Sequence, residues 1–449
     1  MNVPSSTSPD HAASRRRFLK KSAATAAAVV AGPRLFGQTA TGQAPALGSV
    51  LGANDRLVVG FIGVGGQGYN SHLGSVRRGG DEMNAVGAAV CDLFVNRRER
   101  AREALELDSA SAYDDYRRML ERDDIDAIFI GTHDTWHKQI AVDALDAGKH
   151  VYCEKPMTRY FTEGFDIYDA VLRTGQKFQV GSQYCTEGKW HLAAEMIRAG
   201  KIGAPVLGQD SYTRNNPDGE WNYDIDPELS PDTVDWGTWL GPVEERPFSA
   251  DQYHRWRKYY PYCAGILGDL LAHRIHPLLI ATGNPEWPRR VACLGTRQVT
   301  PDRDVPDNTQ VLVEFPSGLS LVVLGSTVNE QGLGQVIRGH EATLYFGGNS
   351  VELRPERPFA DLVDQELHEN VEPGPDIPKH IQNFFDAIRE DKEPNGNIDI
   401  AIKTQTIISM AEMSERMGEM LFFDPETRAL TTGSGRVVEP ITYGSMDAS

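Results

Sequence analysis

The stretch Leu57 to Asn70, LVVGFIGVGGQGYN, decides how the rest of the chain can fold. It begins with an apolar, β-branched run over 57–62, which predicts a buried strand. A G-x-G-x-x-G turn follows directly. In such a turn the first glycine permits a tight turn, the second lets the backbone approach a pyrophosphate, and the third lets the helix pack closely. The candidate cofactor-binding residues of this turn are Gly63, Gly65, Gly66, Gln67 and Gly68.

A second apolar run, Ala85 to Cys91, ends on an acidic residue, Asp92. A carboxylate after the second strand of such a unit accepts hydrogen bonds from both ribose hydroxyls of NAD and repels the 2′-phosphate of NADP. Two cationic residues, Arg97 and Arg98, follow closely. We therefore predict NAD as the cofactor and keep NADP as the alternative.

From Arg56 to Gly181 the apolar pattern alternates between strands and helices, which predicts a doubly wound parallel sheet. The expected strands are 57–62, 85–91, 125–131, 150–153 and 177–181, and the expected helices are 96–107, 113–122, 136–147 and 162–174. Ligands bind at the carboxyl ends of the strands in such sheets. Two polar turns, Thr132 to His137 and Glu154 to Pro156, are expected at those ends.

The length and composition of the chain limit its domain number and the kinds of partner that it can bind. A length of 449 residues predicts two or three domains, and a net charge of −18 argues against nucleic acid and anionic membranes, since both require basic surfaces. Five cysteines without a framework of short spacings predict free, mostly buried thiols.

The N-terminus carries an export signal. Ser14 to Lys20, SRRRFLK, matches the twin-arginine consensus S-R-R-x-F-L-K at every fixed position. The weakly apolar segment behind it, Ser22 to Gly32, is too short to span a bilayer. We therefore treat 1–46 as signal and linker, and we predict a periplasmic or otherwise exported protein without stable membrane insertion. The twin-arginine route carries folded proteins, so a nucleotide can be loaded before export.

Tyr212 to Tyr262, here called the aromatic segment, is rich in Trp and Tyr and has little strand or helix periodicity. Long structured loops of this kind are usually functional. Aromatic faces among Asn, Asp and Arg suit sugar rings, so Trp221, Tyr223 and Trp256 are candidate substrate residues. A purely structural role, pinning a long loop or forming a subunit contact, stays open as the alternative.

The next stretch, Ala264 to His276, has helical apolar spacing. Asp269 and His273 are four residues apart and therefore share one face of that helix. We expect no metal site at His273 and His276, because no set of Cys, His and carboxylate residues at ligand spacing accompanies them.

Four motifs together resemble the Gfo/Idh/MocA oxidoreductases. Residues 147–156, AGKHVYCEKP, resemble the family signature A-G-K-H-V-x-x-E-K-P. Residues 132–137 resemble the T-P-x-x-x-H turn, with His133 in place of proline, and 179–183 resemble the V-G-x-Q element. Residues 264–276 resemble the G-G-x-L-x-D-x-x-x-H-x-x-D helix, with Ala264 and His276 at the two positions that differ.

This resemblance implies an α/β chain: an N-terminal Rossmann dinucleotide-binding domain followed by an α+β domain with a large open, mainly antiparallel sheet. We place these domains at 55–180 and 181–430 and regard 431–449 as a tail. The resemblance implies a homo-oligomer, a dimer or tetramer, that covers the far face of the sheet. It also implies that the bond preceding Pro156 is cis. The export signal and the aromatic segment resemble the secreted bacterial branch of the family.

The resemblance also assigns residues. It gives catalysis to Lys155, His273 and Asp269, and it gives cofactor contacts to Thr132, His137, Glu154 and Lys155. Gln183 joins the candidate substrate residues.

The sequence thus predicts an exported NAD-dependent oxidoreductase that transfers hydride between a sugar or polyol and the nicotinamide by Lys/His acid–base catalysis. A second reading is an NAD-dependent glycosidase that oxidises, eliminates, adds water and reduces again, with its cofactor recycled internally. A third, from a non-enzyme class, is a nucleotide- or sugar-binding protein without turnover.

Overall fold

The computed structural model describes residues 55–443. The twin-arginine motif and the segment behind it lie outside the described residues, so the export signal stays a prediction.

The first sheet has six strands, all parallel, in the order β3-β2-β1-β4-β5-β6. Its strands are β1 (Leu57–Ile62), β2 (Ala85–Cys91), β3 (Ala112–Tyr113), β4 (Ala127–Ile130), β5 (His150–Glu154) and β6 (Phe178–Gly181). This order reverses between β1 and β4, which makes that point of the sheet the expected ligand crevice. The doubly wound parallel sheet is confirmed.

Helices connect these strands and cover the sheet. They are η2 (Gly68–Leu73), α2 (Gly74–Met83), α3 (Val95–Ala104), η3 (Ser109–Ser111), α4 (Tyr116–Leu120), η4 (Asp134–Trp136), α5 (His137–Asp146) and α6 (Phe161–Thr174). The helix expected over 113–122 is shorter than predicted. Its first residue, Tyr113, instead belongs to β3, which pairs with the end of β2.

The second sheet has eleven strands in the order β14-β13-β12-β11-β7-β10-β9-β8-β15-β16-β17. Only β7 and β10 pair in parallel among these described strands; the other neighbours are antiparallel. The strands are β7 (Pro205–Thr213), β8 (Arg290–Thr296), β9 (Asn308–Glu314), β10 (Ser320–Ser326), β11 (Val336–Gly339), β12 (Ala342–Phe346), β13 (Val351–Pro355), β14 (Glu366–His368), β15 (Leu421–Asp424), β16 (Ala429–Thr432) and β17 (Val437–Val438). The large, mainly antiparallel sheet is confirmed.

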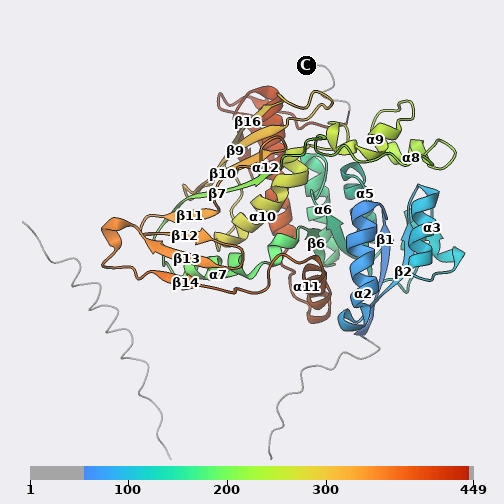
Figure 1. The fold of residues 1–449 in the computed structure, drawn as a ribbon, viewed down its shortest axis with the longest axis horizontal. Coiled ribbons are helices and arrows are strands. Elements are labelled where there is room, and N and C mark those ends of the chain that lie inside the picture. The colour runs from blue at the N-terminus through green and yellow to red at the C-terminus, as the bar shows by residue number, and fades with distance from the viewer. Residues whose placement is uncertain (1–54, 444–449) are drawn as a thin grey trace, which may run out of the picture. The chain divides into compact units, whose positions relative to one another are not determined.

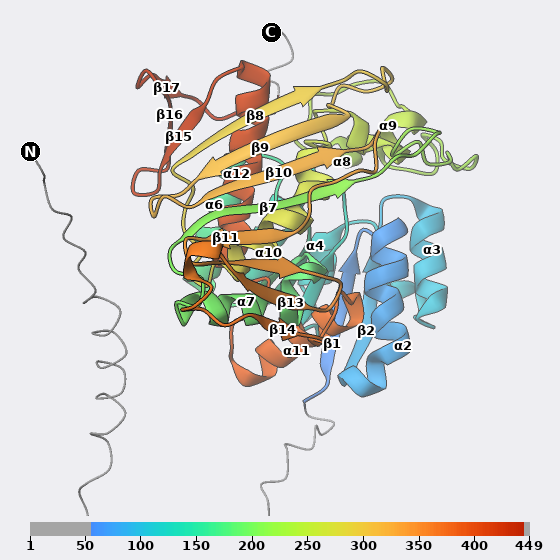
Figure 2. The same ribbon diagram turned by 60° about the vertical axis from the view of Figure 1, so that its left-hand side comes forward.

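One face of this sheet is covered by helices. Figure 2 shows α10 and α12 behind the long strands, and Figure 1 shows both helices to the right of the same strands. α12 contacts β8 and α10 contacts β7. The opposite face bears exposed apolar side chains, among them Leu294 on β8 and Leu312 on β9. The helices of this half are η5 (Gln183–Thr186), α7 (Gly188–Arg198), α8 (Trp236–Leu240), α9 (Ala250–His254), η6 (Trp256–Lys258), η7 (Leu267–Leu271), α10 (Ala272–Ala281), η8 (Arg357–Phe359), α11 (Ile377–Glu390) and α12 (Ile398–Met417).

The chain beyond 430 differs from the predicted tail. β17 pairs with β16, so residues 437–438 belong to the large sheet. Farther on, the Tyr443 hydroxyl donates to Glu163 Oε1 at 3.0 Å. Between β13 and α11 the chain contains one short edge strand, β14, which pairs with β13.

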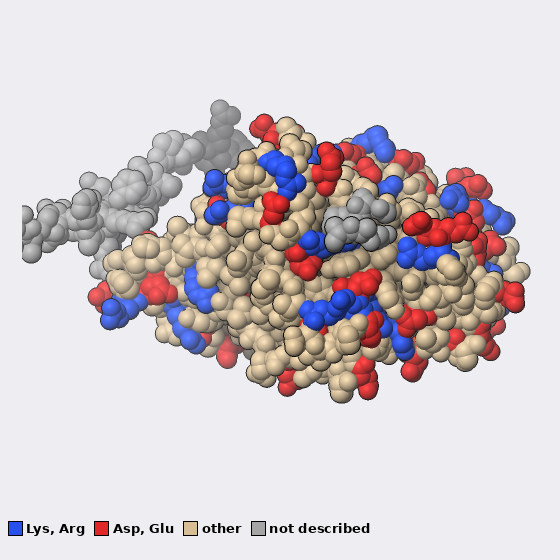
Figure 3. Space-filling model, turned by 90° about the horizontal axis from the view of Figure 1, so that it is seen from above, with Lys and Arg blue, Asp and Glu red and all other residues tan. Residues whose placement is uncertain are grey.

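Acidic and basic side chains are interspersed over the face in Figure 3. Four of the five cysteines are buried and the fifth is partly buried, all as free thiols, as expected. Within residues 55–443, no helix combines the length and the apolar character needed to cross a membrane.

Candidate active site

The glycine turn after β1 has the geometry that its sequence requires. Gly63 adopts a φ of +79°, a conformation that side-chain-bearing residues rarely take. At Gly68 an added Cβ would lie 1.9 Å from the carbonyl oxygen of Gly63, so only glycine lets the helix approach the strand this closely. At Gly66 an added Cβ would meet nothing within 4 Å. The backbone is therefore tightly closed on the sheet side and open on the side where a pyrophosphate would bind.

Asp92 fixes this turn to the end of β2. Its Oδ2 accepts from the backbone N–H of Val64 at 2.9 Å, and its Oδ1 accepts from the N–H of Phe94 at 2.9 Å. Burial raises the pKa of this carboxyl, against the lowering effect of Arg97 and of these backbone bonds. Each carboxylate oxygen has a second lone pair, so the predicted ribose contact is compatible with both bonds.

Glu154, at the end of β5, links the signature to the glycine turn. Its Oε1 accepts from Gln67 Nε2 and from His72 Nε2, both at 2.9 Å, and its Oε2 accepts from the N–H of Lys155 at 3.2 Å. Burial alone would raise the pKa of Glu154, but these donors and the Lys155 charge outweigh it and lower the pKa. A buried carboxylate therefore holds the strand end and the turn together.

Lys155 and Asp269 meet although 114 residues separate them. Lys155 Nζ donates to Asp269 Oδ1 at 2.9 Å and to the Asp269 carbonyl at 2.5 Å. Burial would raise the pKa of Asp269, but the charges of Lys155 and Arg257 hold it well below its ordinary value. Asp269 is therefore a fixed carboxylate that keeps the ammonium group in place. The bond between Lys155 and Pro156 is cis, as expected.

His273 lies one turn beyond Asp269, in α10, which continues from the π-helical turn η7. Its ring is 5.2 Å from that of Tyr184 and 6.0 Å from that of Tyr212 between centroids. Burial lowers the pKa of His273 well below its usual value, and the charge of Lys155 lowers it further. The imidazole is therefore neutral near pH 7 and able to accept a proton.

One cavity of about 1110 Å³ connects these groups. It opens at the carboxyl ends of β1, β2, β4 and β5, where the parallel sheet was expected to bind ligands. The predicted residues that line it are Gly63, Gly65, Gly66, Gln67, Asp92, Thr132, Glu154, Lys155, Gln183, Tyr223, Trp256, Asp269 and His273. The cavity therefore extends from the glycine turn to the Lys155–Asp269 pair.

Three predicted residues, Gly68, His137 and Trp221, lie outside the lining that residues 55–443 form. The two ring nitrogens of His137 face the carbonyls of Pro156 at 2.8 Å and Thr132 at 3.2 Å, so this side chain braces the two turns. Trp221 is 1% exposed, and its indole N–H donates to Asp269 Oδ2 at 3.0 Å. A ring this deeply buried offers no face to a sugar, in contrast to the predicted substrate contact.

Sequence reasoning missed Arg257, Tyr212 and Asp134, which also line the cavity. Arg257 Nε donates to Asp269 Oδ1 at 2.8 Å, and its guanidinium carbon lies 4.1 Å from the Trp256 ring centroid. The sequence signal for Arg257 was its position beside Trp256 in the aromatic segment. That its partner is Asp269 can be seen only in the folded structure. Within residues 55–443 no group of three or more His, Cys, Asp and Glu side chains is arranged to hold a metal ion.

The aromatic segment reaches from the second sheet to the turns of the first. Val234 forms an antiparallel bridge with Phe94, and the N–H of Val95 donates to the carbonyl of Thr233 at 3.1 Å. At the next turn, His133 Nε2 lies 2.9 Å from the carbonyl of Trp239. The segment therefore forms one wall of the cavity along both nucleotide-binding turns.

Two family models match the chain. Residues 57–182 match the oxidoreductase family with an NAD-binding Rossmann fold, and residues 218–440 match the oxidoreductase family's C-terminal alpha/beta domain. The first match confirms NAD as the cofactor of this domain. The open backbone at Gly66 and the cavity beside it fit a dinucleotide.

Among curated proteins, the chain is 31% identical over 213 residues to a glycosyl hydrolase family 109 protein of Shewanella sp. strain ANA-3, covering 44% of this chain and 45% of that protein. It is 30% identical over 216 residues to an alpha-N-acetylgalactosaminidase of Shewanella oneidensis, covering 45% of this chain and 46% of that protein. The matched region thus spans less than half the length of these relatives.

Solved structures share the fold. A levoglucosan dehydrogenase in complex with NADH and levoglucosan superposes with a TM-score of 0.62 at 20% identity, covering 82% of this chain and 99% of that one. An aldose-aldose oxidoreductase of Caulobacter crescentus gives a TM-score of 0.62 at 17% identity, covering 82% of this chain and all of that one (100%). With both domain models matched in order, the chain belongs to the Gfo/Idh/MocA oxidoreductase family.

Proposed function

We propose that this protein transfers hydride between a CH–OH carbon of a sugar or polyol and a bound nicotinamide. The observation that carries the proposal is the group formed by Lys155, Asp269 and His273 on the wall of the cavity that also contains the glycine turn. A carbohydrate is supported by the sugar-processing proteins that share the fold and by the cavity-lining aromatic residues Tyr223 and Trp256.

His273, Lys155 and Asp269 have different roles in the proton transfer that accompanies hydride transfer. NAD, when bound, supplies the hydride acceptor. His273 is neutral, so it takes the hydroxyl proton of the substrate or returns it in the reverse direction. Lys155 donates a hydrogen bond to the same substrate oxygen and stabilises the negative charge that develops there. Asp269 keeps the lysine ammonium oriented.

The test is an assay of purified protein over a broad panel of sugars and polyols, with NAD and with an added electron acceptor. Formation of an oxidised sugar supports the proposal. If the protein binds NAD and a sugar but neither oxidises sugars nor cleaves glycosides, it is a binding protein, and the proposal is rejected.

The curated relatives favour a second candidate, an NAD-dependent glycosidase. In this route the sugar is oxidised, loses its aglycone by elimination, adds water and is reduced again, so the net reaction is hydrolysis. Support comes from the names of the relatives, a glycosyl hydrolase family 109 protein and an alpha-N-acetylgalactosaminidase. The aromatic segment along the cavity also suits a cofactor that stays bound.

An aryl α-N-acetylgalactosaminide separates the two candidates. The glycosidase releases the phenol without added acceptor and without net change in the nicotinamide. The simple dehydrogenase leaves the aryl glycoside bond intact.

Two further proposals concern the whole protein. Residues 14–20 support export by the twin-arginine route. The exposed apolar side chains of Leu294 and Leu312, on the uncovered face of the large sheet, support a homo-oligomer in which this face is buried.

A further inference from the structure

Both carboxylate oxygens of Asp269 are held by the aromatic segment. Oδ1 accepts from Arg257 Nε at 2.8 Å, in addition to Lys155 Nζ at 2.9 Å, and Oδ2 accepts from Trp221 Nε1 at 3.0 Å. Lys155 alone would contact one oxygen and leave the carboxylate free to rotate about its bond to Cβ. The two donors of the aromatic segment remove that freedom.

Trp221 is itself tightly fixed. Its φ is +66°, a conformation that a bulky residue adopts only where the surroundings impose it. The ring is 1% exposed, and the guanidinium carbon of Arg303 lies 5.7 Å from its centroid. The Arg303 side chain is fully buried at 0% exposure. The indole therefore cannot turn away from Asp269 without disturbing this packing.

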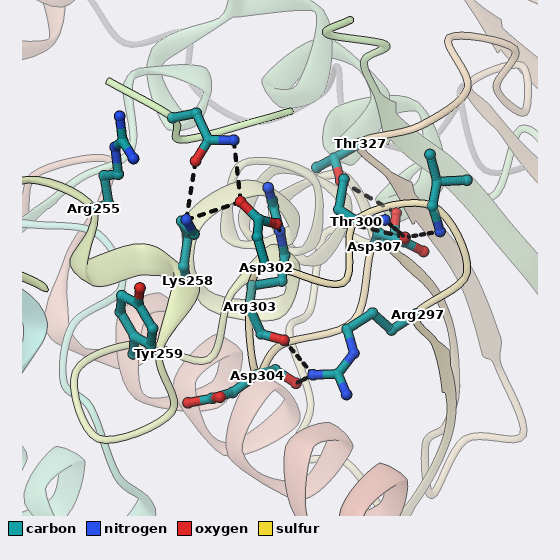
Figure 4. A network of polar contacts seen from close by, with 12 residues as sticks. Arg255, Lys258, Tyr259, Arg297, Thr300, Asp302, Arg303, Asp304, Asp307 and Thr327 are labelled. Carbon is teal, nitrogen blue, oxygen red and sulfur yellow. Dashed lines mark hydrogen bonds and ion pairs between the residues drawn. The ribbon is translucent and has the colours of Figure 1, made fainter. Parts of the chain in front are cut away.

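The residue after Trp221 is clamped to a second loop (Figure 4). Lys258 Nζ donates to Asn222 Oδ1 at 3.0 Å and forms an ion pair with Asp302 Oδ2 at 2.9 Å. Asn222 Nδ2 donates to the same Asp302 oxygen at 3.1 Å, and Arg303 Nε donates to Asp302 Oδ1 at 3.0 Å. The clamp therefore joins Trp221 to the residues that pack on its ring.

The loop that supplies Asp302 and Arg303 is fixed in turn. Asp307 Oδ2 accepts from the N–H groups of Val299 at 2.8 Å and Thr300 at 3.0 Å, and from the Thr300 hydroxyl at 3.1 Å. These bonds close the loop on itself beside the large sheet, as Figure 4 shows.

We propose that Trp221 and Arg257 are positioning residues for Asp269, and that the clamp formed by Asn222, Lys258, Asp302 and Arg303 fixes Trp221. The proposal rests on the proposed function, since Asp269 acts by orienting Lys155. It gives Trp221, which lies outside the described lining of the cavity, a task in catalysis without contact to the substrate. A positioning error of about 1 Å reduces turnover by up to about 100-fold, so this support is consequential.

The first test is Trp221→Phe, which keeps an aromatic ring beneath Arg303 and removes the indole N–H together with the five-membered ring that carries it. We expect kcat to fall by about 10- to 100-fold, with KM for the sugar and affinity for NAD within about threefold of the unmodified protein. The matched control is Trp236→Phe. Trp236 lies in the same segment and donates to the carbonyl of Arg246 at 2.8 Å, but it is outside the cavity lining formed by residues 55–443. The control should keep the kcat of the unmodified protein.

A double-mutant cycle with Asp269→Asn identifies the route of action. If Trp221 acts through Asp269, Trp221→Phe should change kcat by less than about threefold in the Asp269→Asn background. Equal losses in both backgrounds overturn the proposal. Should Trp221→Phe fail to fold, Arg257→Lys takes its place, because it keeps the charge but loses the planar Nε–H donor.

Crystal structures of the variants decide the question independently of turnover. The proposal expects the Asp269 carboxylate to be rotated or split over orientations in Trp221→Phe and in Arg257→Lys, but not in Trp236→Phe. An unchanged, fully ordered Asp269 in both variants overturns it. If the unmodified protein converts no sugar or glycoside, the proposed function fails while this structural outcome still stands.

Discussion

Lys155 and His273 come from different halves of the chain, Lys155 from the end of the parallel strand β5 and His273 from α10. Within residues 55–443, the Lys155 ammonium group donates to Asp269, and the His273 ring contacts Ser182 and two tyrosine rings. These contacts do not involve the glycine turn. Removal of either side chain should therefore affect proton handling more than nucleotide binding.

We predict that Lys155→Ala and His273→Ala each lower turnover by about 10²–10⁴-fold, the range that general acid–base catalysis contributes. NAD affinity, measured by calorimetry, should stay close to that of the unmodified protein. The double variant should be little worse than either single one, because the two groups act as a unit. Retention of activity within a few-fold by both single variants would show that these residues are structural.

A second prediction at this scale concerns Asp134, at the start of η4. Burial raises its pKa from 3.8 to about 7, against the lowering effect of Arg257 and Arg159. The folded protein therefore holds this proton more tightly than the unfolded chain. The stability that this group contributes is fully present below about pH 4 and is lost as the pH rises to about 7.

Asp134→Asn cannot ionise. Its free energy of unfolding relative to the unmodified protein should therefore increase between about pH 4 and about pH 8, by an amount on the order of 4 kcal/mol. Urea unfolding at several pH values measures this. Asp146→Asn, at the exposed end of α5, should show no such trend. Parallel pH profiles for Asp134→Asn and the unmodified protein would contradict the prediction.

The catalytic candidates and Trp221 show which parts of the site could be predicted from the sequence and which could not. Lys155, Asp269 and His273 lie in motifs of fixed spacing, so their proximity could be predicted together with the fold. Trp221 was assigned to the substrate because aromatic residues among polar ones suit sugars. Its burial depends on Arg303, which is 82 positions away, and on a backbone conformation that no local pattern reveals.

At the scale of elements, apolar runs of ordinary strand length predicted β1, β2, β4, β5 and β6 to within about two residues. β7 was missed although it lies inside the large sheet between β10 and β11. Its sequence, PVLGQDSYT, contains Pro, Gly and Asp, which are depleted in strands. Pairing with two neighbours decides its structure, and such pairing is not visible in a local window.

The aromatic segment is the element whose role the sequence left open. Trp239 packs against Tyr253 at 5.3 Å, Tyr262 at 5.0 Å and His133 at 4.4 Å between ring centroids. Phe94, from the turn after β2, belongs to the same apolar cluster. This cluster holds the segment against the two nucleotide-binding turns.

We predict that Trp239→Ala loosens this contact and increases the dissociation rate of NADH by about 10-fold or more, because truncating a buried Trp removes about 3–5 kcal/mol of packing. Stopped-flow fluorescence measures the rate. Tyr223→Ala, which alters the cavity at the Asp269 end of the same segment, should leave it within about twofold. An unchanged rate in Trp239→Ala would show that the segment does not retain the cofactor.

At the scale of the whole molecule, one prediction concerns the predicted export signal, Ser14 to Lys20, which lies outside the described residues. We predict that replacing Arg15 and Arg16 together with Lys leaves the full-length precursor in the cytoplasm. Cell fractionation with immunoblotting measures this, and replacement of Arg17 with Lys, at the variable position of the motif, serves as a charge-matched control that should still be exported. Normal export of the twin-lysine variant would contradict the twin-arginine assignment.

The parallel sheet could be predicted from periodicity, whereas the order of the two domains and the large antiparallel sheet were implied by the family resemblance. The eleven-strand order could not be predicted in either way, because β15, β16 and β17 return from the C-terminus to extend the sheet beyond β8. That return also brings Tyr443 onto Glu163, a contact between residues 280 positions apart.

The bridge between Phe94 and Val234 has a consequence for how the protein comes to carry its cofactor. It joins residues from the two halves of the chain, so the cavity wall is complete only after both halves have folded. If the protein is exported as we propose and the segment retains the nucleotide, loading takes place before export, and each molecule leaves the cytoplasm with a single dinucleotide. Its turnover would then be independent of the cell's ratio of oxidised to reduced nicotinamide. A catalytic cycle that returns the retained dinucleotide to its starting redox state can repeat without limit. Net oxidation of the substrate would instead stop after one turnover, unless an external electron acceptor reached the nicotinamide ring.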